Sequence, residues 1–336
     1  MLYITTRNDD NTFTSHKALV EDHAPDGGRF VPFRMPLYAA DEIAGFKDKP
    51  FNQTVAEILN VFFSARLTGW DIDFCIGRNA VRLLSMSHRI VVSELWHNAE
   101  AKFSYLVDCL YRKMRNTEDA LSAVDWAATA VRIAVLFGIY GQMLRCEYLD
   151  TDQAFDVSVP AEDFLMPMAV FYARQMGLPV SMIISTCEEN GNIWDFIHRG
   201  VVNTNAVSEN LISGLEKLVH ATLGYSEVHG FRQACQSGQV YALSEEYLPV
   251  MNQAFFCAVA GKSRAGATIN SLFRSNSYVI DPVTALCYGG LQDYRAKSGS
   301  SRVTVLFAER TPLDFSKEIS EATGIPAMSL VDHVKL

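Results

Sequence analysis

The sequence lacks several features that mark specialised classes of protein. Its seven cysteines include no Cys-x-x-Cys pair, and none of its eight histidines lies four residues from another. Scattered cysteines in odd number are typical of a reducing compartment, not of a disulfide framework, and the histidine spacing gives a metal site no local support. Gly-x-Gly-x-x-Gly, Gly-x-Ser-x-Gly and His-Glu-x-x-His are absent as well, which removes the best-known nucleotide, hydrolase and zinc-protease motifs.

An excess of positive charge is also missing. Lys and Arg number 29 against 38 Asp and Glu, so the net charge is −9, which argues against a nucleic-acid partner. No run of about 20 uncharged apolar residues suggests a membrane span. The most apolar run, residues 133–144, is flanked by Arg132 and Arg145 and is expected to be a buried helix. The start of the sequence resembles no signal peptide, so we predict a cytoplasmic protein without a membrane partner.

The chain does have enough apolar residues for a large core. It contains 336 residues, of which 49% are hydrophobic and 11% aromatic. Apolar periodicity predicts helices at 53–66, 71–84, 99–114, 121–146, 164–176, 207–223, 244–261 and 282–297, and strands at 89–95, 155–160, 180–185 and 302–307. Strands separated by helices predict an α/β fold whose parallel sheet is flanked by helices on both faces.

One segment is similar to the end of a phosphate-binding loop. It reads Ala-Gly-Lys-Ser at residues 260–263, but the full motif needs a glycine where Phe256 stands. The preceding residues also favour a helix over a glycine loop. The sequence therefore does not predict such a site.

Five short segments, spread over nearly the whole chain, occur in a recognisable order. They are Tyr-Ile-Thr-Thr-Arg at 3–7, Asp-Gly-Gly-Arg-Phe-Val-Pro at 26–32, Val-Asp-Trp-Ala at 124–127, Met-Gly-Leu-Pro at 176–179, and Tyr-Val-Ile-Asp-Pro-Val-Thr-Ala at 278–285. Together they resemble the motifs of threonine synthases, which are fold-type-II pyridoxal-phosphate (PLP) enzymes. The resemblance implies a truncated version of that fold, which is like the tryptophan synthase β fold.

The segment that would carry the reactive lysine departs from the family pattern. Residues 94–105 align with Glu-Leu-Phe-His-Gly-Pro-Thr-x-Ala-Phe-Lys-Asp, and Ser104 stands at the position of the lysine that forms the Schiff base. A hydroxyl group cannot form an imine with the cofactor aldehyde. Lys102 lies two residues earlier, about 200° away around a helix, so it would point to nearly the opposite side.

Two further cofactor contacts of the family are changed. Its glycine-rich phosphate loop aligns with residues 159–166, where Glu162 and Asp163 place negative charge instead. Glu309 replaces the threonine that would face the cofactor ring nitrogen. The more ordinary explanation of Glu162 and Asp163 is that they are acidic residues at the start of a helix, where the helix dipole favours them.

The resemblance also indicates a deletion. The family has a small open-sheet subdomain at the position where this chain has only residues 115–123, and nine residues cannot form a strand–helix–strand unit. We therefore predict two regions: an N-terminal threonine synthase-like region at 1–95, and an α/β core at 96–336 that lacks the small subdomain.

These departures favour a threonine synthase-like pseudoenzyme that has no PLP cofactor and no metal. It would act as a scaffold, as a regulatory partner or as a binder of a small molecule. The candidate catalytic residues are His97, Glu100 and Ser104. The candidate ligand-binding residues are Asn98, Lys102, Glu162, Asp163 and Glu309.

Two alternatives remain open at this point. In the first, the chain is a repurposed enzyme whose acidic cleft performs acid–base chemistry or holds a divalent cation, with His97 as a possible base. In the second, it is a PLP enzyme that uses Lys102. Against the first, a purely structural role is more common for a histidine at a strand–helix turn and for a small serine on a helix.

The predicted deletion has a consequence for assembly. Loss of the small subdomain would expose the apolar faces of the helices at 99–114 and 121–146. Exposed apolar surface of that size usually marks a contact with a partner. We therefore predict a homodimer or a complex with another protein.

Overall fold

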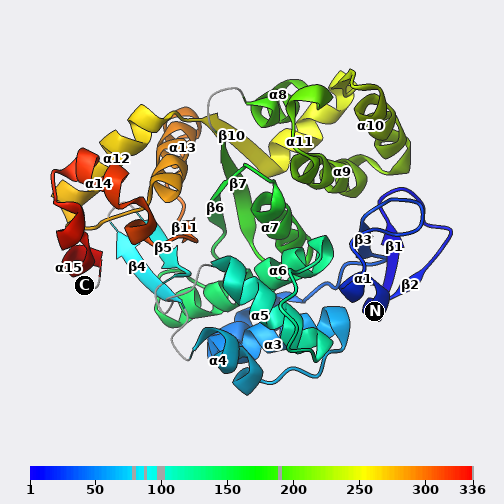
Figure 1. The fold of residues 1–336 in the computed structure, drawn as a ribbon, viewed down its shortest axis with the longest axis horizontal. Helices are drawn as coiled ribbons and strands as arrows, with labels where there is room; N and C mark the ends of the chain where they lie inside the picture. Colours follow the sequence, from blue (N-terminus) through cyan, green and yellow to red (C-terminus); the bar gives the residue numbers. More distant parts are fainter. Residues whose placement is uncertain (78–80, 87–88, 97–102, 188–190, 335–336) are drawn as a thin grey trace.

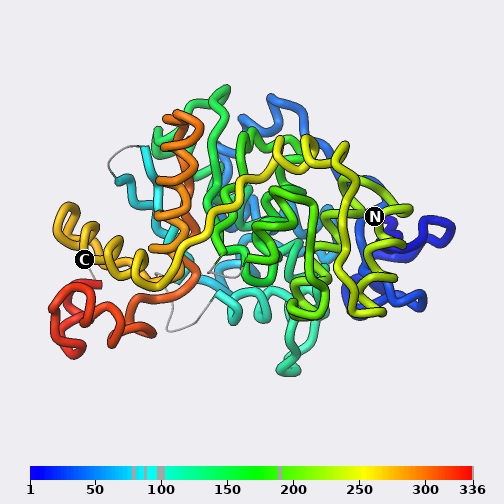
Figure 2. Tube along the Cα trace, turned by 90° about the horizontal axis from the view of Figure 1, so that it is seen from above, coloured from blue at the N-terminus to red at the C-terminus, as the bar shows by residue number. Residues whose placement is uncertain are grey.

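The computed structural model describes residues 1–77, 81–86, 89–96, 103–187 and 191–334. Its strands are β1 (Leu2–Thr5), β2 (Phe13–Thr14), β3 (Phe30–Pro32), β4 (Arg82–Met86), β5 (Ile90–Glu94), β6 (Phe155–Pro160), β7 (Val180–Cys187), β8 (Val201–Asn203), β9 (Val240–Ala242), β10 (Phe255–Val259) and β11 (Thr304–Ala308). The N-terminal strands and the C-terminal helices lie at opposite ends of the long axis (Figures 1 and 2).

Helices make up most of the remaining structure. The α-helices are α1 (Ser15–Val20), α2 (Ala40–Gly45), α3 (Phe51–Phe63), α4 (Gly69–Ile76), α5 (Phe103–Arg115), α6 (Asp125–Arg145), α7 (Leu165–Gln175), α8 (Asn192–Arg199), α9 (Glu209–Leu223), α10 (Tyr225–Ser237), α11 (Leu248–Ala254), α12 (Lys262–Asn276), α13 (Pro282–Ser298), α14 (Ser316–Thr323) and α15 (Leu330–Val334). Short 3₁₀ turns, η1 (Phe46–Asp48), η3 (Thr204–Ala206), η4 (Glu245–Tyr247), η5 (Pro312–Phe315) and η6 (Ala327–Ser329), connect some of them.

The central sheet has six strands in the order β10-β7-β6-β11-β5-β4. All neighbouring pairs are parallel except β4 with β5, which is antiparallel. The predicted α/β class and the helix-flanked parallel sheet are confirmed. The prediction of parallel strands throughout misses the antiparallel edge strand β4, which occupies part of the helix predicted at 71–84. The observed helix at this place, α4, ends at Ile76 because Gly77 follows it with a positive φ of 72°.

The strands of this sheet are apolar on both faces because helices cover both. Along β11, Val305 and Phe307 join the larger core cluster, whereas Leu306 and Ala308 join the second cluster on the other face. This alternation follows from the two-residue period of a strand. Helix α13 packs across β6, β7, β10 and β11, and α7 packs on β6 and β7 and against α6.

One predicted helix is wrong in its C-terminal part, where the structure has a strand. Residues 244–261 were expected to form one helix, but α11 ends at Ala254 and β10 follows it without a break. The strand reads Phe-Phe-Cys-Ala-Val, a short apolar run that periodicity alone does not distinguish from a buried helix. Gly261 and Lys262 therefore follow a strand and begin α12, contrary to our expectation, although Phe256 still excludes the full phosphate-loop motif.

Helix α6 is the central helix of the larger core. By length and composition this helix could cross a membrane. However, 89% of its most apolar 18-residue stretch is buried inside the fold. Helix α5 likewise buries its apolar face, which includes Phe103, Leu110 and Met114. The apolar faces that the sequence led us to expect on the surface are thus covered within the chain, so that argument for a partner does not hold. The dimer itself stays a prediction.

The linker between α5 and α6, residues 116–124, contains no helix or strand. The predicted deletion near 115–123 and the predicted division at residue 95 stay predictions, although β4 and β5, which precede residue 95, belong to the central sheet.

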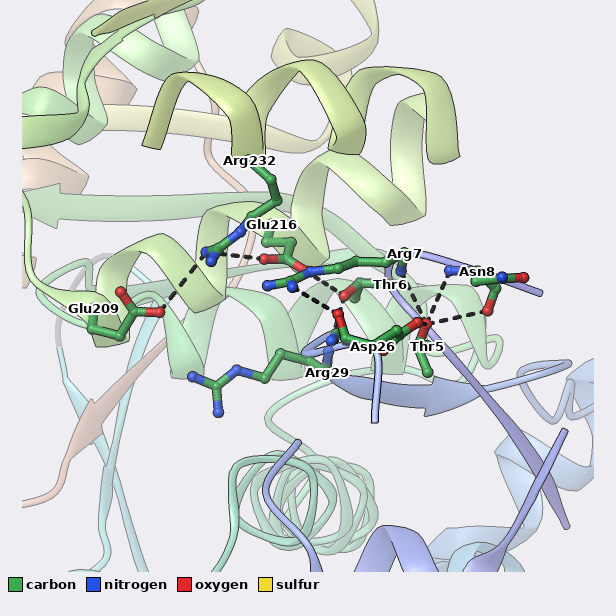
Figure 3. A network of polar contacts seen from close by, with 10 residues as sticks. Thr5, Thr6, Arg7, Asn8, Asp26, Arg29, Glu209, Glu216 and Arg232 are labelled. Atoms are coloured by element: carbon green, nitrogen blue, oxygen red, sulfur yellow. Dashed lines mark hydrogen bonds and ion pairs between the residues drawn. The ribbon is translucent and has the colours of Figure 1, made fainter. Parts of the chain in front are cut away.

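A polar network joins the N-terminal segment to α9 (Figure 3). At its centre lies the buried carboxylate of Glu216, which accepts a hydrogen bond from the Thr6 hydroxyl. The guanidinium groups of Arg7 and Arg232 each approach the same carboxylate to 3.4 Å. Arg7 also donates to the Asp26 carbonyl at 2.9 Å. Two of the motifs behind the family resemblance, at 3–7 and 26–32, therefore hold the N-terminal segment in place.

A second buried ion pair links α9 to α6. Lys217 is fully buried, and its Nζ lies 2.9 and 2.8 Å from the two carboxylate oxygens of Asp125. Asp22 accepts the backbone N–H of Asp125 at 2.8 Å and pairs with Arg29. The motif at 124–127 thus begins α6 and anchors α9 at the same point.

Candidate functional site

A cleft opens at the carboxyl ends of β6 and β11, where open α/β sheets usually bind ligands. Its floor is a cavity of about 80 Å³ whose lining residues are Arg132, Pro160, Glu162, Asp163, Met166, Asp281, Val283, Thr284, Phe307, Glu309 and Arg310. Two pockets of about 590 and 580 Å³ share some of these residues, and they extend the cleft past Ser104 on one side and past Lys262 on the other.

The turn from β6 to α7 forms one wall of the cleft. Asp163 accepts the backbone N–H of Leu165 at 3.0 Å through its own carboxylate. Phe164, which precedes α7, has a positive φ of 58° although it is not glycine, and its side chain is fully buried. A Cβ on Gly214 of α9 would lie 2.7 Å from the Phe164 Cβ, so the turn is packed tightly from behind. The first amide of α7, that of Leu165, therefore faces a carboxylate of the chain itself.

Glu309 follows β11 and is half-buried in the cleft. Burial raises the pKa of its carboxyl group above the usual value, and the nearby Arg132 guanidinium opposes this shift. Arg132 belongs to α6, where its Nη1 donates to the Ala128 carbonyl at 3.2 Å and its guanidinium lies 5.3 Å from the centre of the Phe103 ring. The Arg132 Nε is buried and has no hydrogen-bond partner in the part of the chain that the structure describes.

Asp281 forms the opposite wall and has a structural role. It is buried, and it accepts the backbone N–H groups of Val283 and Thr284 at 3.0 Å each, which caps the start of α13. Burial raises the pKa of its carboxyl group, and the hydrogen bonds from Thr284 oppose the shift. Tyr278, from the same motif, donates to the buried carboxylate of Glu94 at 2.9 Å.

The structure brings together four of the residues singled out from the sequence. Ser104, Asp163 and Glu309 line the pocket beside α5, and Glu162 lines the floor of the cleft. Ser104 is exposed in the first turn of α5. The other candidates, His97, Asn98, Glu100 and Lys102, lie outside the described residues.

Two arginines of the cleft were missed. Arg132 and Arg310 line both the floor and the pocket beside α5. A signal for Arg132 was available, because it is the only charged residue between positions 126 and 144 of a helix expected to be buried. A charged residue in such a position usually has a partner or a function. Arg310 carries no comparable signal, since it follows a strand in an ordinary polar segment.

The family resemblance implies PLP, and the described residues of the cleft fit it poorly. At the position of the phosphate loop, the carboxylate of Asp163 already accepts an amide at the start of α7, and Glu162 adds a second negative charge nearby. Glu162 and Leu165 stand where the family motif has its two glycines, so the turn has lost the residues that would let backbone amides approach an anion closely. A divalent cation has no better support, because no group of three Asp, Glu, His or Cys side chains within the described residues could hold one.

Glu309 gives a testable pH dependence. The pKa of the Glu309 carboxyl group is higher in the folded state than in the unfolded state. Its ionisation therefore lowers the free energy of unfolding as the pH rises from the unfolded-state pKa of about 4.3 through the folded-state pKa, and this loss is absent at lower pH. We expect Glu309→Gln to raise the free energy of unfolding by about 0.5 kcal/mol at pH 7 and to lose this gain near pH 4. Urea unfolding at the two pH values measures it. The exposed Glu246→Gln serves as control, and equal effects of both variants would contradict the assignment.

Comparison with known proteins agrees with the resemblance. The family model "Threonine synthase N terminus" matches residues 2–79. Threonine synthase-like 1 of Macaca fascicularis is 22% identical over 178 residues, which cover 49% of this chain and 24% of that protein. Threonine synthase-like 1 of Mus musculus is 21% identical over 231 residues, which cover 64% of this chain and 30% of that protein. The matched part of the chain thus spans about a quarter to a third of these relatives.

Solved structures extend the similarity over the whole fold. A PLP-bound threonine synthase from Brucella melitensis superposes with a TM-score of 0.81 at 18% identity, covering 97% of this chain and 92% of that one. The threonine synthase from yeast superposes with a TM-score of 0.77 at 14% identity, covering 96% of this chain and 89% of that one. The chain therefore resembles the threonine synthases at its N-terminus, over residues 2–79, and as a whole it has their fold-type-II architecture.

Proposed function

We propose that this chain is a threonine synthase-like pseudoenzyme: it does not hold PLP as a Schiff base, and it uses the inherited cleft to bind a different small molecule. One observation carries the proposal. At the start of α7, where the family would bind the cofactor phosphate, the carboxylate of Asp163 already accepts the backbone N–H of Leu165. An anion and this carboxylate cannot both accept that N–H without repelling each other.

Electrostatics make the cofactor unfavourable at this position. Two like charges about 4 Å apart repel by about 4 kcal/mol at an effective dielectric constant of 20. That is roughly a thousandfold in affinity for each contact. Asp163 and Glu162 would each make such a contact with a phosphate at the β6–α7 turn. Arg132 and Arg310 line the floor of the cleft as well and would offset part of this repulsion.

The cleft nevertheless keeps features of a binding site. It combines a small polar floor with two larger pockets, and the Arg132 Nε is a buried donor with no partner among the described residues. Buried donors in native structures are nearly always satisfied by protein, water or ligand. A ligand with a hydrogen-bond acceptor would satisfy this one. Through this cleft the protein would serve as a small-molecule sensor, scaffold or regulatory partner, in the cytoplasm.

Addition of PLP to the purified protein tests the proposal. We expect no visible absorbance band of an internal aldimine beyond that produced by surface lysines, and no specific lysine labelled after borohydride reduction. Lys102→Ala is the matched variant, because Lys102 is the lysine nearest in sequence to the expected position. An aldimine band in the native chain that Lys102→Ala abolishes would refute the proposal.

A gain-of-function variant sharpens the same test. Replacing Glu162 and Asp163 with glycine frees the start of α7 and removes two negative charges. We expect the double variant to bind PLP non-covalently at least about tenfold more tightly than the native chain, since each like-charge contact is worth more than that. Fluorescence titration measures it. Unchanged affinity would show that these carboxylates do not exclude the cofactor.

A second candidate function rests on Glu309. A carboxyl group whose pKa is raised by burial can act as a general acid, and Arg132 beside it can stabilise developing negative charge. Acid–base catalysis on a substrate in the pocket beside α5 is therefore the alternative to simple binding. Turnover of a bound ligand that Glu309→Gln abolishes, without loss of ligand binding, would favour this alternative.

A further inference from the structure

Two buried thiols meet where β7 and β10 lie side by side (Figure 1). The Sγ atoms of Cys187 and Cys257 are 3.7 Å apart, and both cysteines are free thiols. The two strands are parallel, with Cys187 opposite Val259 and Cys257 opposite Ser185, so the cysteines are diagonal neighbours on one face of the sheet. Neither lines the cleft or its two larger pockets, so the proposed function leaves this pair of thiols unexplained.

Helix α8 presents its N-terminus to the sulfur of Cys187. Gly191 precedes the helix, and a Cβ there would lie 2.9 Å from this sulfur, so a side chain at this position would displace it. The backbone N–H of Trp194, in the first turn of α8, donates to the same sulfur. The hydrogen bond with Cys257 and this amide hold the pKa of Cys187 below its usual value, against the effect of burial. Such surroundings stabilise a thiolate, which is the form that reacts with oxidants.

The two cysteines differ in reactivity. Contact with Cys187 and burial raise the pKa of the Cys257 thiol, so this sulfur stays protonated. Cys187 is 6% exposed and Cys257 1%, so a small oxidant that enters from solvent reaches Cys187 first. This is the arrangement of an attacking thiol with a resolving thiol beside it.

We propose that Cys187 and Cys257 form a redox modification site, at which hydrogen peroxide converts the two thiols into a reversible disulfide. In the first step the Cys187 thiolate attacks a peroxide oxygen. An S–O bond forms, the O–O bond breaks, and the hydroxide that leaves takes up the proton that Cys187 had released, which gives water. Cys187 is then a sulfenic acid.

In the second step the Cys257 sulfur attacks the sulfur of this sulfenic acid. The S–S bond forms, the S–O bond breaks, and the Cys257 proton leaves with the hydroxide as a second water. Two thiols have then lost two electrons, and one peroxide has gained them. The site is independent of the proposed function of the cleft.

The disulfide requires a small movement. An S–S bond is about 2.05 Å long, so the two sulfurs must approach each other by roughly 1.7 Å. Rotation of the two side chains and a small shift at Cys187, the last residue of β7, supply this approach. A bond formed with such an adjustment is strained and therefore easily reduced. This suits a transient modification in a reducing compartment, which is the usual form of a disulfide there.

Peptide mapping of the native chain tests the proposal. The purified chain is treated with about a tenfold excess of hydrogen peroxide, alkylated in denaturant and digested without reduction. We expect mass spectrometry to find peptides joined through Cys187 and Cys257 in most of the chains, and dithiothreitol to release them. Recovery of the two cysteines as free thiols, as higher oxides or joined mainly to other cysteines overturns the proposal.

Two variants separate the attacking thiol from the resolving thiol. In Cys257→Ala we expect dimedone to label Cys187 as a persistent sulfenic acid. In Cys187→Ala the label on Cys257 should be at least about tenfold weaker, because a thiol of raised pKa contains little thiolate. Equal labelling of the two variants would overturn the assigned roles. Cys146→Ala is the matched control, since Cys146 is exposed, and the Cys187–Cys257 disulfide should form in it as in the native chain. Circular dichroism checks that each variant is folded, and the result on the native chain stands without them.

Discussion

Lys217→Met is expected to lower the free energy of unfolding by about 3–5 kcal/mol, which is a large part of the stability of an average domain. Lys217 is fully buried, and its ammonium group contacts both carboxylate oxygens of Asp125. Asp125 is only 13% exposed, so removal of the lysine leaves a carboxylate charge that water reaches poorly. Urea denaturation followed by circular dichroism measures the loss.

Two matched variants separate this effect from a general loss of charge. Lys17 and Glu21 form an exposed pair on the surface, and Lys17→Met should change stability by less than about 0.5 kcal/mol. The double variant Lys217→Met/Asp125→Leu removes both buried charges and should recover most of the loss. A loss equal to that of Lys17→Met, or a double variant that is less stable than Lys217→Met, would contradict the explanation.

We expect Gly141→Ala to destabilise the fold by about 1–3 kcal/mol, although alanine normally favours a helix. A Cβ at this position of α6 would lie 2.7 Å from the carbonyl oxygen of Phe46, and a backbone atom cannot rotate away as a side chain can. The 3₁₀ turn η1 would have to move off α6. The shift of the urea midpoint measures the cost.

Gly266 provides the opposite case. It lies within α12, and a Cβ there would meet no atom within 4 Å. Gly266→Ala should therefore stabilise the chain by about 0.5–1 kcal/mol, because alanine loses less conformational entropy than glycine in a helix. Opposite signs for the two substitutions would confirm that the contact with Phe46 decides the effect. Stabilisation by both would show that η1 can move at little cost.

Much of the fold was predictable because the buried strands and helices have strong local patterns. The runs at 155–160, 180–185 and 302–307 form β6 and most of β7 and β11, and the helices expected at 207–223 and 282–297 match α9 and α13 within two residues. Helices α10 and α12 were not predicted, and two short strands lie where helix was expected. Strand β4 occupies part of an expected helix, and β10 follows α11 without a turn to mark the change. In both places pairing with a neighbouring strand, β5 for β4 and β7 for β10, decides the conformation, and the local apolar pattern does not record that pairing.

The candidate site was predictable only in part, and for a different reason. Glu162, Asp163, Ser104 and Glu309 were found because each replaces a residue in a family motif. Arg132 belongs to no cofactor motif, and only the packing of α6 beneath the sheet edge brings it to Glu309. Asp281 was noted as part of a motif, but its role as the cap of α13 depends on backbone geometry.

The sequence by itself determined the α/β class, the family resemblance and the loss of the phosphate-loop glycines, because these depend on residue identity and local periodicity. Only the tertiary structure decided that Arg132 and Arg310 share a cleft with Glu309, and that the apolar faces of α5 and α6 are covered. These facts depend on which segments meet in space. A side chain acquires its partners and its burial from distant residues, and no local pattern records them.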